Sequence, residues 1–250
     1  MKIQQIRNAT LKISYGGITF LLDPWLQDQG TGVSARTVTP AMEGVKCPLN
    51  SLTMSVKEIL EKVDYCLVTH THFDHFTPDY LPQDICILTQ NKEDCKKIEE
   101  LGFLHVSAIN TTFKIGDVEI TKTPALHGDN DRVIAMMGDV TGYLLQGEEK
   151  TLYLAGDTVF YEGITETLQK FSPDVIVLNC CEATIPEGRL IMNREDIAAV
   201  CNLCPNAVII ATHLDSVNHA LLTSDDILRF AQERKLSKVI VPHNGECIQI

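Results

Sequence analysis

Short runs of apolar residues, separated by polar turns, recur along the chain and predict β-strands. Near the N-terminus the runs at 3–6, 9–14 and 18–22 predict three strands, with Gly16-Gly17 as the turn before the third. Further strands are predicted at 65–68, 85–88, 113–123 (two pieces turned at Gly116-Asp117), 141–145, 152–154, 175–178, 208–211 and 239–241.

Segments with helical spacing of apolar residues lie between the later strands. They predict helices at 55–61, 91–101, 163–171, 194–204 and 224–234, with Ser55 and Ser224 as N-caps. Strands therefore gather first and then alternate with helices, and this order occurs twice. We predict an α/β fold in which two mixed β-sheets pack on each other with helices outside, in one domain spanning residues 1–250.

Residues 27–53 form a long segment rich in Gly, Thr, Pro and Ser, without a clear period. Loops of this length are usually lids or binding loops. Because the segment begins directly after a strand end, we favour a lid over a mobile surface excursion.

The composition is that of an ordinary globular protein, with 44% hydrophobic and 22% charged residues. No apolar run approaches the ~20 residues of a membrane span, and the N-terminus lacks the apolar core of a signal peptide. We therefore expect a cytoplasmic protein that does not enter a membrane. The net charge of -12 argues against nucleic-acid binding.

Nine cysteines are scattered along the chain, which is not the pattern of a secreted disulfide scaffold. Cys201 and Cys204 form a lone CxxC pair near the end of a predicted helix. We favour core packing for this pair over a redox or zinc-binding role.

A dense group of chemically active side chains follows the predicted strand at 65–68. His70, His72, Asp74 and His75 place three imidazoles and a carboxylate within six residues. Each histidine alone would more often be structural than a ligand. Together with the aspartate they indicate a metal site, because such spacing is typical of metal ligands.

Other His and Asp residues also stand directly after predicted strands. They are Asp23, His127, Asp157 and His213. Because strand ends converge on one edge of a sheet sandwich, these groups can share a site with the 70–75 segment although they span 190 residues. Imidazole and carboxylate ligands without thiolate suit zinc, manganese, iron or nickel, and the set is large enough for two ions.

The segment His70-x-His72-x-Asp74-His75, with the later His127, Gly156-Asp157-Thr158 and His213, resembles the metallo-β-lactamase superfamily. This resemblance implies an αββα sandwich and two divalent ions, with zinc as the first expectation. It implies that one ion is held by His70, His72 and His127, the second by Asp74, His75 and His213, and both by Asp157. Asp23 would then brace the histidine segment.

The start Leu21-Leu22-Asp23-Pro24-Trp25 and the Gly-Asp-Thr motif look like the branch that contains L-ascorbate-6-phosphate lactonase. Two segments depart from that branch. Asn8 stands where a Gly-His pair is common, and the residues around His213 differ from Pro-x-His-Tyr-Gly.

These observations predict a metal-dependent hydrolase that uses a metal-bridged hydroxide on a small ester, lactone or phosphodiester, anionic substrates included. Asp74 would orient the hydroxide and accept its proton. Trp25, Glu182 and His219 are candidates for the substrate pocket, as is Asn179, whereas His243 reads as a turn residue. The alternatives are a diiron oxidoreductase of the same fold and a non-catalytic metal-binding module, and a homo-oligomer is compatible with every reading.

Overall fold

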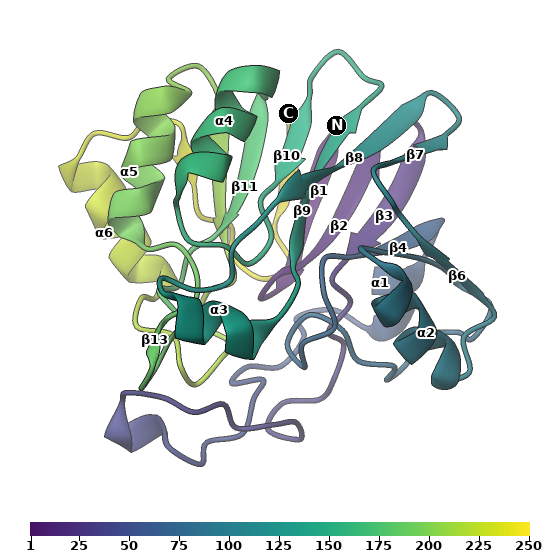
Figure 1. Ribbon diagram of the computed structural model, residues 1–250, viewed down its shortest axis with the longest axis horizontal. Helices are drawn as coiled ribbons and strands as arrows, with labels where there is room; N and C mark the ends of the chain where they lie inside the picture. The colour runs from purple at the N-terminus through teal and green to yellow at the C-terminus, as the bar shows by residue number, and fades with distance from the viewer.

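Two mixed seven-stranded sheets form the centre of the molecule in the computed structural model, which describes residues 1–250 (Figure 1). The first sheet has the order β16 (Cys247–Gln249), β1 (Lys2–Arg7), β2 (Thr10–Tyr15), β3 (Ile18–Leu22), β4 (Tyr65–Val68), β5 (Cys86–Thr89) and β6 (His105–Ala108). The pairs from β16 to β3 are antiparallel, and those from β3 to β6 are parallel.

The second sheet repeats this division. Its order is β15 (Val239–Ile240), β14 (Val208–Thr212), β11 (Val175–Asn179), β10 (Leu152–Leu154), β9 (Thr141–Gln146), β8 (Val118–Pro124) and β7 (Thr112–Ile115). The pairs from β15 to β10 are parallel, and those from β10 to β7 are antiparallel. In α/β proteins, ligands commonly bind at the carboxyl ends of parallel strands. Each of the two sheets has such strand ends in its parallel half.

Helices cover the outer faces of the sandwich. Helices α1 (Val56–Leu60) and α2 (Lys92–Glu100) lie on one side, and α4 (Glu162–Phe171), α5 (Arg194–Leu203) and α6 (Ser224–Glu233) lie on the other (Figure 1). Helix α3 (Asp131–Met137), the 3-10 turn η1 (Pro40–Met42) and the hairpin β12 (Thr184–Ile185) and β13 (Gly188–Arg189) complete the fold. No helix combines the length and the apolar character needed to cross a membrane.

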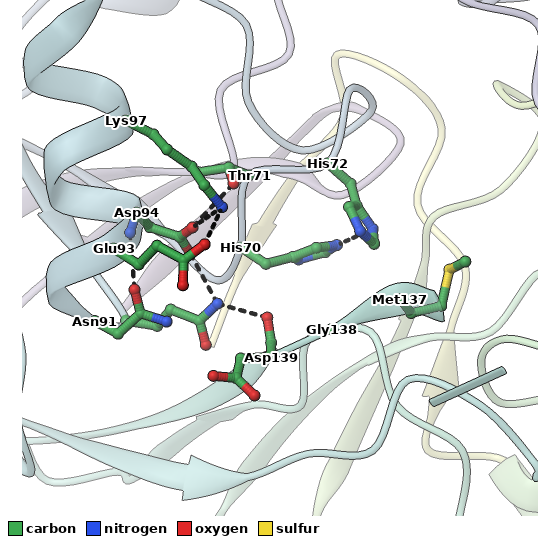
Figure 2. A pocket seen from close by; sticks show the side chains of 11 residues that line it. His70, Thr71, His72, Asn91, Glu93, Asp94, Lys97, Met137, Gly138 and Asp139 are labelled. Carbon is green, nitrogen blue, oxygen red and sulfur yellow. Dashed lines mark hydrogen bonds and ion pairs between the residues drawn. The ribbon is translucent and has the colours of Figure 1, made fainter. Parts of the chain in front are cut away.

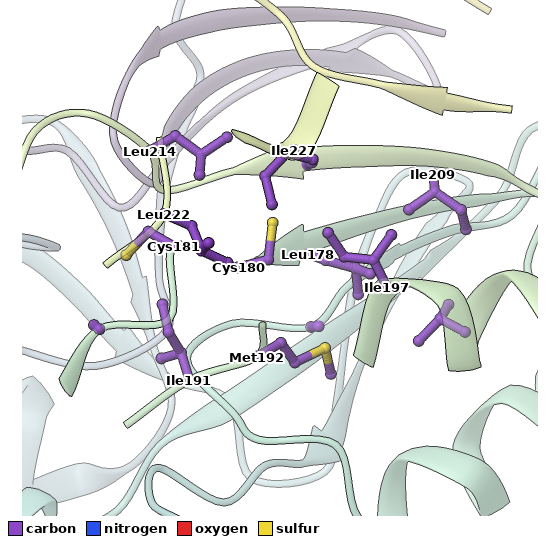
Figure 3. Packing of buried hydrophobic residues seen from close by; sticks show 14 of the residues in the cluster. Leu178, Cys180, Cys181, Ile191, Met192, Ile197, Ile209, Leu214, Leu222 and Ile227 are labelled. Atoms are coloured by element: carbon purple, nitrogen blue, oxygen red, sulfur yellow. The ribbon is translucent and has the colours of Figure 1, made fainter. Parts of the chain in front are cut away.

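Three apolar clusters hold these layers together. One fills the space between the two sheets and includes Ile13, Phe20 and Leu145. Another joins the first sheet to α1 and α2. The largest joins the second sheet to α4–α6, and Figure 3 shows Leu178 and Ile209 of the sheet near Ile197 and Ile227 of the helices. The predicted αββα sandwich is therefore confirmed.

The structure adds elements that the apolar pattern did not indicate. Strands β6 and β16 lie at edges of the first sheet, so their residues are largely exposed and lack a buried run. Helix α3 is short, although its N-cap Asn130 and the following Gly138 are ordinary boundary signals. One expected detail is wrong, because Thr223 and not Ser224 caps α6 through a capping box with Asp226.

All nine cysteines are free. Cys201 and Cys204 are half-buried and pack against the cluster that joins the second sheet to its helices, as expected for core residues.

Candidate metal centre

The predicted ligands come together beyond the ends of strands. The segment from His70 to His75 follows β4, Asp157 follows β10 and His213 follows β14, all strands of the parallel halves. His127 follows β8 in the other half of the second sheet. Two packed sheets therefore bring side chains from four distant segments to one point.

Three groups of donor atoms in this region are tight enough to hold an ion, with every donor in a group within 4.8 Å of the others. They are His70, His72 and His127; His70, His75 and Asp157; and Asp74, His75 and His213. Two of these groups are the triads expected for separate ions, and all members other than the half-buried His72 are buried.

Asp157 occupies the position between these triads. Its Oδ2 lies 3.2 Å from His75 Nε2, 3.5 Å from His127 Nε2 and 3.8 Å from His213 Nε2. A single carboxylate oxygen thus faces imidazoles of both triads, which is the geometry that a bridging ligand needs.

The buried carboxylates of this site need compensating positive charge. Burial raises the pKa of Asp74 and Asp157, but the neighbouring imidazoles, chiefly His213 and His75, outweigh it and keep both carboxyls ionised. No lysine or arginine forms an ion pair with them, and their ion-pair partners are histidines alone. Positive charge must come from imidazolium protons or from bound metal ions.

The histidines of the site differ in their pKa values because their surroundings differ. Burial lowers the pKa of His127 to about 4 and also lowers the pKa of His70 and His72, so these rings are neutral. Burial also lowers the pKa of His75, but Asp157 and Asp23 raise it to about 10. Neutral imidazole is the form that binds metals, and at His75 a cation bound to the cage would take the place of the proton.

Asp23 lies where it can brace the histidine segment. Its Oδ1 accepts a hydrogen bond from the Thr69 backbone N–H at 2.7 Å, and its Oδ2 lies 2.8 Å from His75 Nδ1. Hydrogen bonding at Nδ1 leaves Nε2 of His75 as the metal-facing nitrogen, and such contacts orient ligand rings.

The donor set therefore fits divalent ions of the zinc, manganese, iron or nickel type. It consists of imidazole nitrogens and carboxylate oxygens, is buried, and has no lysine or arginine paired to its carboxylates. The roles of the individual residues as ligands stay predictions.

Comparisons with known proteins agree with this geometry. The family described as "Beta-lactamase superfamily domain" matches residues 19–214. The "UPF0173 protein YddR" of Bacillus subtilis is 36% identical over 252 residues, which cover 98% of both chains.

The chain belongs to the metallo-β-lactamase superfamily.

Two solved structures are similar to this chain over their whole length. "A possible metal-dependent hydrolase" from Veillonella parvula is 31% identical, with a TM-score of 0.93 over 100% of this chain and 99% of the other. An isothiocyanate hydrolase from Delia radicum gut bacteria is 33% identical, with the same TM-score and the same coverage. The specific resemblance to the ascorbate-6-phosphate lactonase branch stays a prediction.

Several contacts around this metallo-β-lactamase cage were not expected. Asn8 Nδ2 donates to the Asp74 carbonyl oxygen and lies 3.2 Å from His213 Nε2. His127 Nδ1 lies 3.0 Å from the Leu190 carbonyl oxygen. Cys181 Sγ lies 3.5 Å from His213 Nδ1, and burial raises the pKa of this thiol, which favours its protonated form.

The backbone conformation of three residues marks this site in a way that the sequence does not show. Asn8, Asp23 and His213 all have positive φ, at 53°, 42° and 64°. Non-glycine residues in this region are uncommon and often mark functional sites. Asn179, expected in the pocket, instead donates a 2.7 Å hydrogen bond to Asp157 Oδ1.

A cavity of about 250 Å³ opens on the cage. Four predicted ligands line it together with a mostly apolar wall, and the complete lining is Ala35, Arg36, His72, Phe73, Asp74, His127, Met136, Met137, Asp157, Ile185, Leu190 and His219. This is room for a small ligand. Of the four residues expected in the pocket, His219 lines it.

Two further expected pocket residues, Trp25 and Glu182, also lie elsewhere. Trp25 is fully buried in the core, edge-on to Phe73 at 6.2 Å and beneath the guanidinium of Arg7. Its apolar ring packs behind the cavity wall rather than in it. Glu182 is not among the lining residues; its backbone N–H donates to the Met192 carbonyl oxygen and its φ is 54°.

A second cavity, of about 320 Å³, is bordered by His70 and His72 and is polar (Figure 2). Its other walls come from α2 and the residues just before it, and from residues 137–139. The buried carboxylate of Asp94 accepts hydrogen bonds there from Thr71, Gln90 and Lys97. These polar groups satisfy one another.

Part of the segment 27–53 reaches the cavity on the cage. Ala35 and Arg36 line the apolar cavity, and Arg36 Nη1 pairs with Glu187 at 2.8 Å. The Asn218 side chain holds the same segment through Ala35 and Met42.

Proposed function

We propose that this protein is a hydrolase in which metal ions and Asp74 act on an electrophilic carbon of a small, uncharged substrate with an apolar body. The observation that carries this proposal is the apolar cavity on the cage, because it supplies both a place for the organic part and access to the predicted ligands. The relatives named as metal-dependent hydrolases support the same reaction class.

Metal ions bound to the cage would supply a hydroxide nucleophile near neutral pH and polarise the substrate. The residues of the chain contribute orientation. Asp74 lines the cavity, so its carboxylate can align the attacking water and accept its proton. Phe73, Met137 and the other apolar residues exclude water from the reacting group.

The cavity favours carbon electrophiles over phosphodiesters. The only cationic side chain in its lining, Arg36, is paired with Glu187 at 2.8 Å, and Asp74 and Asp157 add negative charge. An anionic phosphodiester would depend on the metal ions alone for compensation. Small esters and lactones remain the substrates that we expect from the sequence.

Isothiocyanates are the first compounds to test, because they are small, uncharged and apolar and because a relative of 33% identity is named for this activity. In the reaction, water adds to the central carbon of R–N=C=S, the bond between that carbon and nitrogen breaks while the R–N bond stays, and nitrogen takes both protons of the water. The products are R–NH₂ and O=C=S.

The test is hydrolysis of benzyl isothiocyanate and 4-nitrophenyl acetate by protein reconstituted with zinc, manganese, iron or nickel. We expect Asp74→Ala to lose activity by about 10²-fold or more. Asp117→Asn, in an exposed turn, is the control and should behave as wild type. Full activity and full metal occupancy in Asp74→Ala would contradict the proposal.

Metal analysis of the native protein separates the alternatives. Iron together with oxygen consumption would favour a diiron oxidoreductase. Full occupancy without turnover of any probe would favour a non-catalytic metal-binding module.

A further inference from the structure

The cavity on the cage contains few polar groups besides the predicted ligands. Only Arg36 and His219 remain once His72, Asp74, His127 and Asp157 are set aside. The Arg36 side chain is 59% exposed and paired with Glu187, so it lies at the mouth. His219 is 5% exposed and is the one buried polar side chain of the lining that has no predicted metal role.

The imidazole of His219 has an unused hydrogen-bonding atom. Its Nδ1 is shielded from solvent and has no partner in the protein. Such buried groups are rare in native structures, and each costs about 1–3 kcal/mol when left unsatisfied. Burial also lowers the pKa of His219, so the neutral ring offers one donor and one acceptor.

The backbone around His219 is held firmly. The Thr184 N–H donates to the His219 carbonyl oxygen at 2.9 Å. The adjacent Asn218 accepts from the Ala35 N–H at 3.0 Å and donates to the Ala35 and Met42 carbonyl oxygens at 2.8 and 3.1 Å. The ring is therefore presented to the cavity by a pre-organised segment, as orienting groups of binding sites usually are.

We propose that His219 hydrogen-bonds the substrate heteroatom that joins the attacked carbon to the apolar body, the nitrogen of an isothiocyanate or the leaving oxygen of an ester. This inference rests on the proposed function. With the electrophilic carbon at the cage and the organic part against the apolar wall, the joining heteroatom lies between them. Outside the predicted ligands, His219 is the only buried polar side chain of the lining, so it is the group available to meet this heteroatom.

The first test compares two esters that differ in leaving group, phenyl acetate and 4-nitrophenyl acetate, with the metal-reconstituted protein. His219→Ala should lower kcat/KM for phenyl acetate by about 10²-fold, in the range for one donor in a desolvated site. The better leaving group needs less help, so the loss for 4-nitrophenyl acetate should be clearly smaller. His219→Gln, which can still donate, should recover part of the rate.

Controls separate this contact from a structural role. Metal content and thermal unfolding should match wild type in both His219 variants, and the exposed His243→Ala should match it in every assay. Equal losses for the two esters, or no loss in His219→Ala, would overturn the inference while leaving the proposed function in place.

A binding measurement tests the contact without turnover. Benzyl azide resembles benzyl isothiocyanate in shape and carries an acceptor nitrogen at the joining position, but it has no carbon to attack. Calorimetry should show about five- to tenfold weaker binding to His219→Ala than to wild type, the equivalent of one hydrogen bond. Equal affinity, or no binding by wild type, would refute the contact. Binding that depends on His219 in a protein that hydrolyses no probe would instead refute the proposed function alone.

Discussion

Asp23 Oδ2 lies 2.8 Å from His75 Nδ1, although the two residues are 52 positions apart. The same carboxylate also holds the Thr69 backbone at the start of the histidine segment. One buried side chain at the end of β3 therefore sets both the ring orientation of a predicted ligand and the path of the chain that carries it.

Replacing Asp23 by Asn should weaken metal retention by about 10- to 100-fold, the usual effect of removing a carboxylate that orients a histidine ligand. The neutral amide cannot stabilise the charge that His75 shares with a bound cation. Competition with a chromogenic chelator measures the affinity. Asp64 accepts a hydrogen bond from the Thr19 N–H far from the cage, so Asp64→Asn serves as control. Wild-type affinity in Asp23→Asn would show that the contact is dispensable.

Metal removal should destabilise the fold. A ligand that binds only the folded chain stabilises it by about 4 kcal/mol at a free concentration of 1,000 times its Kd. For a chain of this size the thermal midpoint should rise by roughly 8–16 °C. Calorimetric scans of chelator-treated protein with added zinc measure the shift. Calcium, which prefers oxygen ligands, should have little effect, and no shift with any of the four expected metals would argue against the site.

Gly156 precedes Asp157 and should tolerate no side chain, because both its backbone conformation and the space around it exclude one. Its φ is +68°, and a Cβ would lie 2.5 Å from the Thr141 carbonyl oxygen. Gly17 has a similar φ of +78° but open space around it, which makes Gly17→Ala a matched control. We expect about 1–2 kcal/mol of destabilisation for Gly17→Ala and a clearly larger loss, with lower metal content, for Gly156→Ala. Urea unfolding gives both values, and equal losses would mean that the backbone relieves the clash.

Arg7 should hold the beginning of the 27–53 segment. Its buried guanidinium donates to the carbonyl oxygens of Trp25, Gln27 and Asn50 and stacks on the Trp25 ring at 4.9 Å. Arg7→Ala leaves these oxygens without donors and should cost about 3 kcal/mol or more.

Limited proteolysis should then cut the Arg7→Ala variant within 27–53 before wild type is cut. Arg229→Ala removes a side chain that is 69% exposed and should change stability by less than about 1 kcal/mol. Identical cleavage in the Arg7 variant and wild type would show that other contacts hold the segment.

Much of the fold and the cage followed from local patterns. Buried strands such as β4 and β11 appear as apolar runs, because a strand covered on both faces needs apolar side chains at every position. The cluster at 70–75 is contiguous, so its metal-binding character was evident. The edge strands β6 and β16 were not predicted, because exposed strands carry no such apolar run.

Sequence alone determined the residue types and their places at strand ends, because these depend on periodicity within a few neighbouring positions. Only the tertiary structure decided which distant groups meet. Asn8 beside His213, Asn179 on Asp157, Trp25 in the core and His219 in the cavity all depend on sheet pairing and on the path of long loops. Such contacts join segments up to 205 positions apart, and no local pattern carries that information.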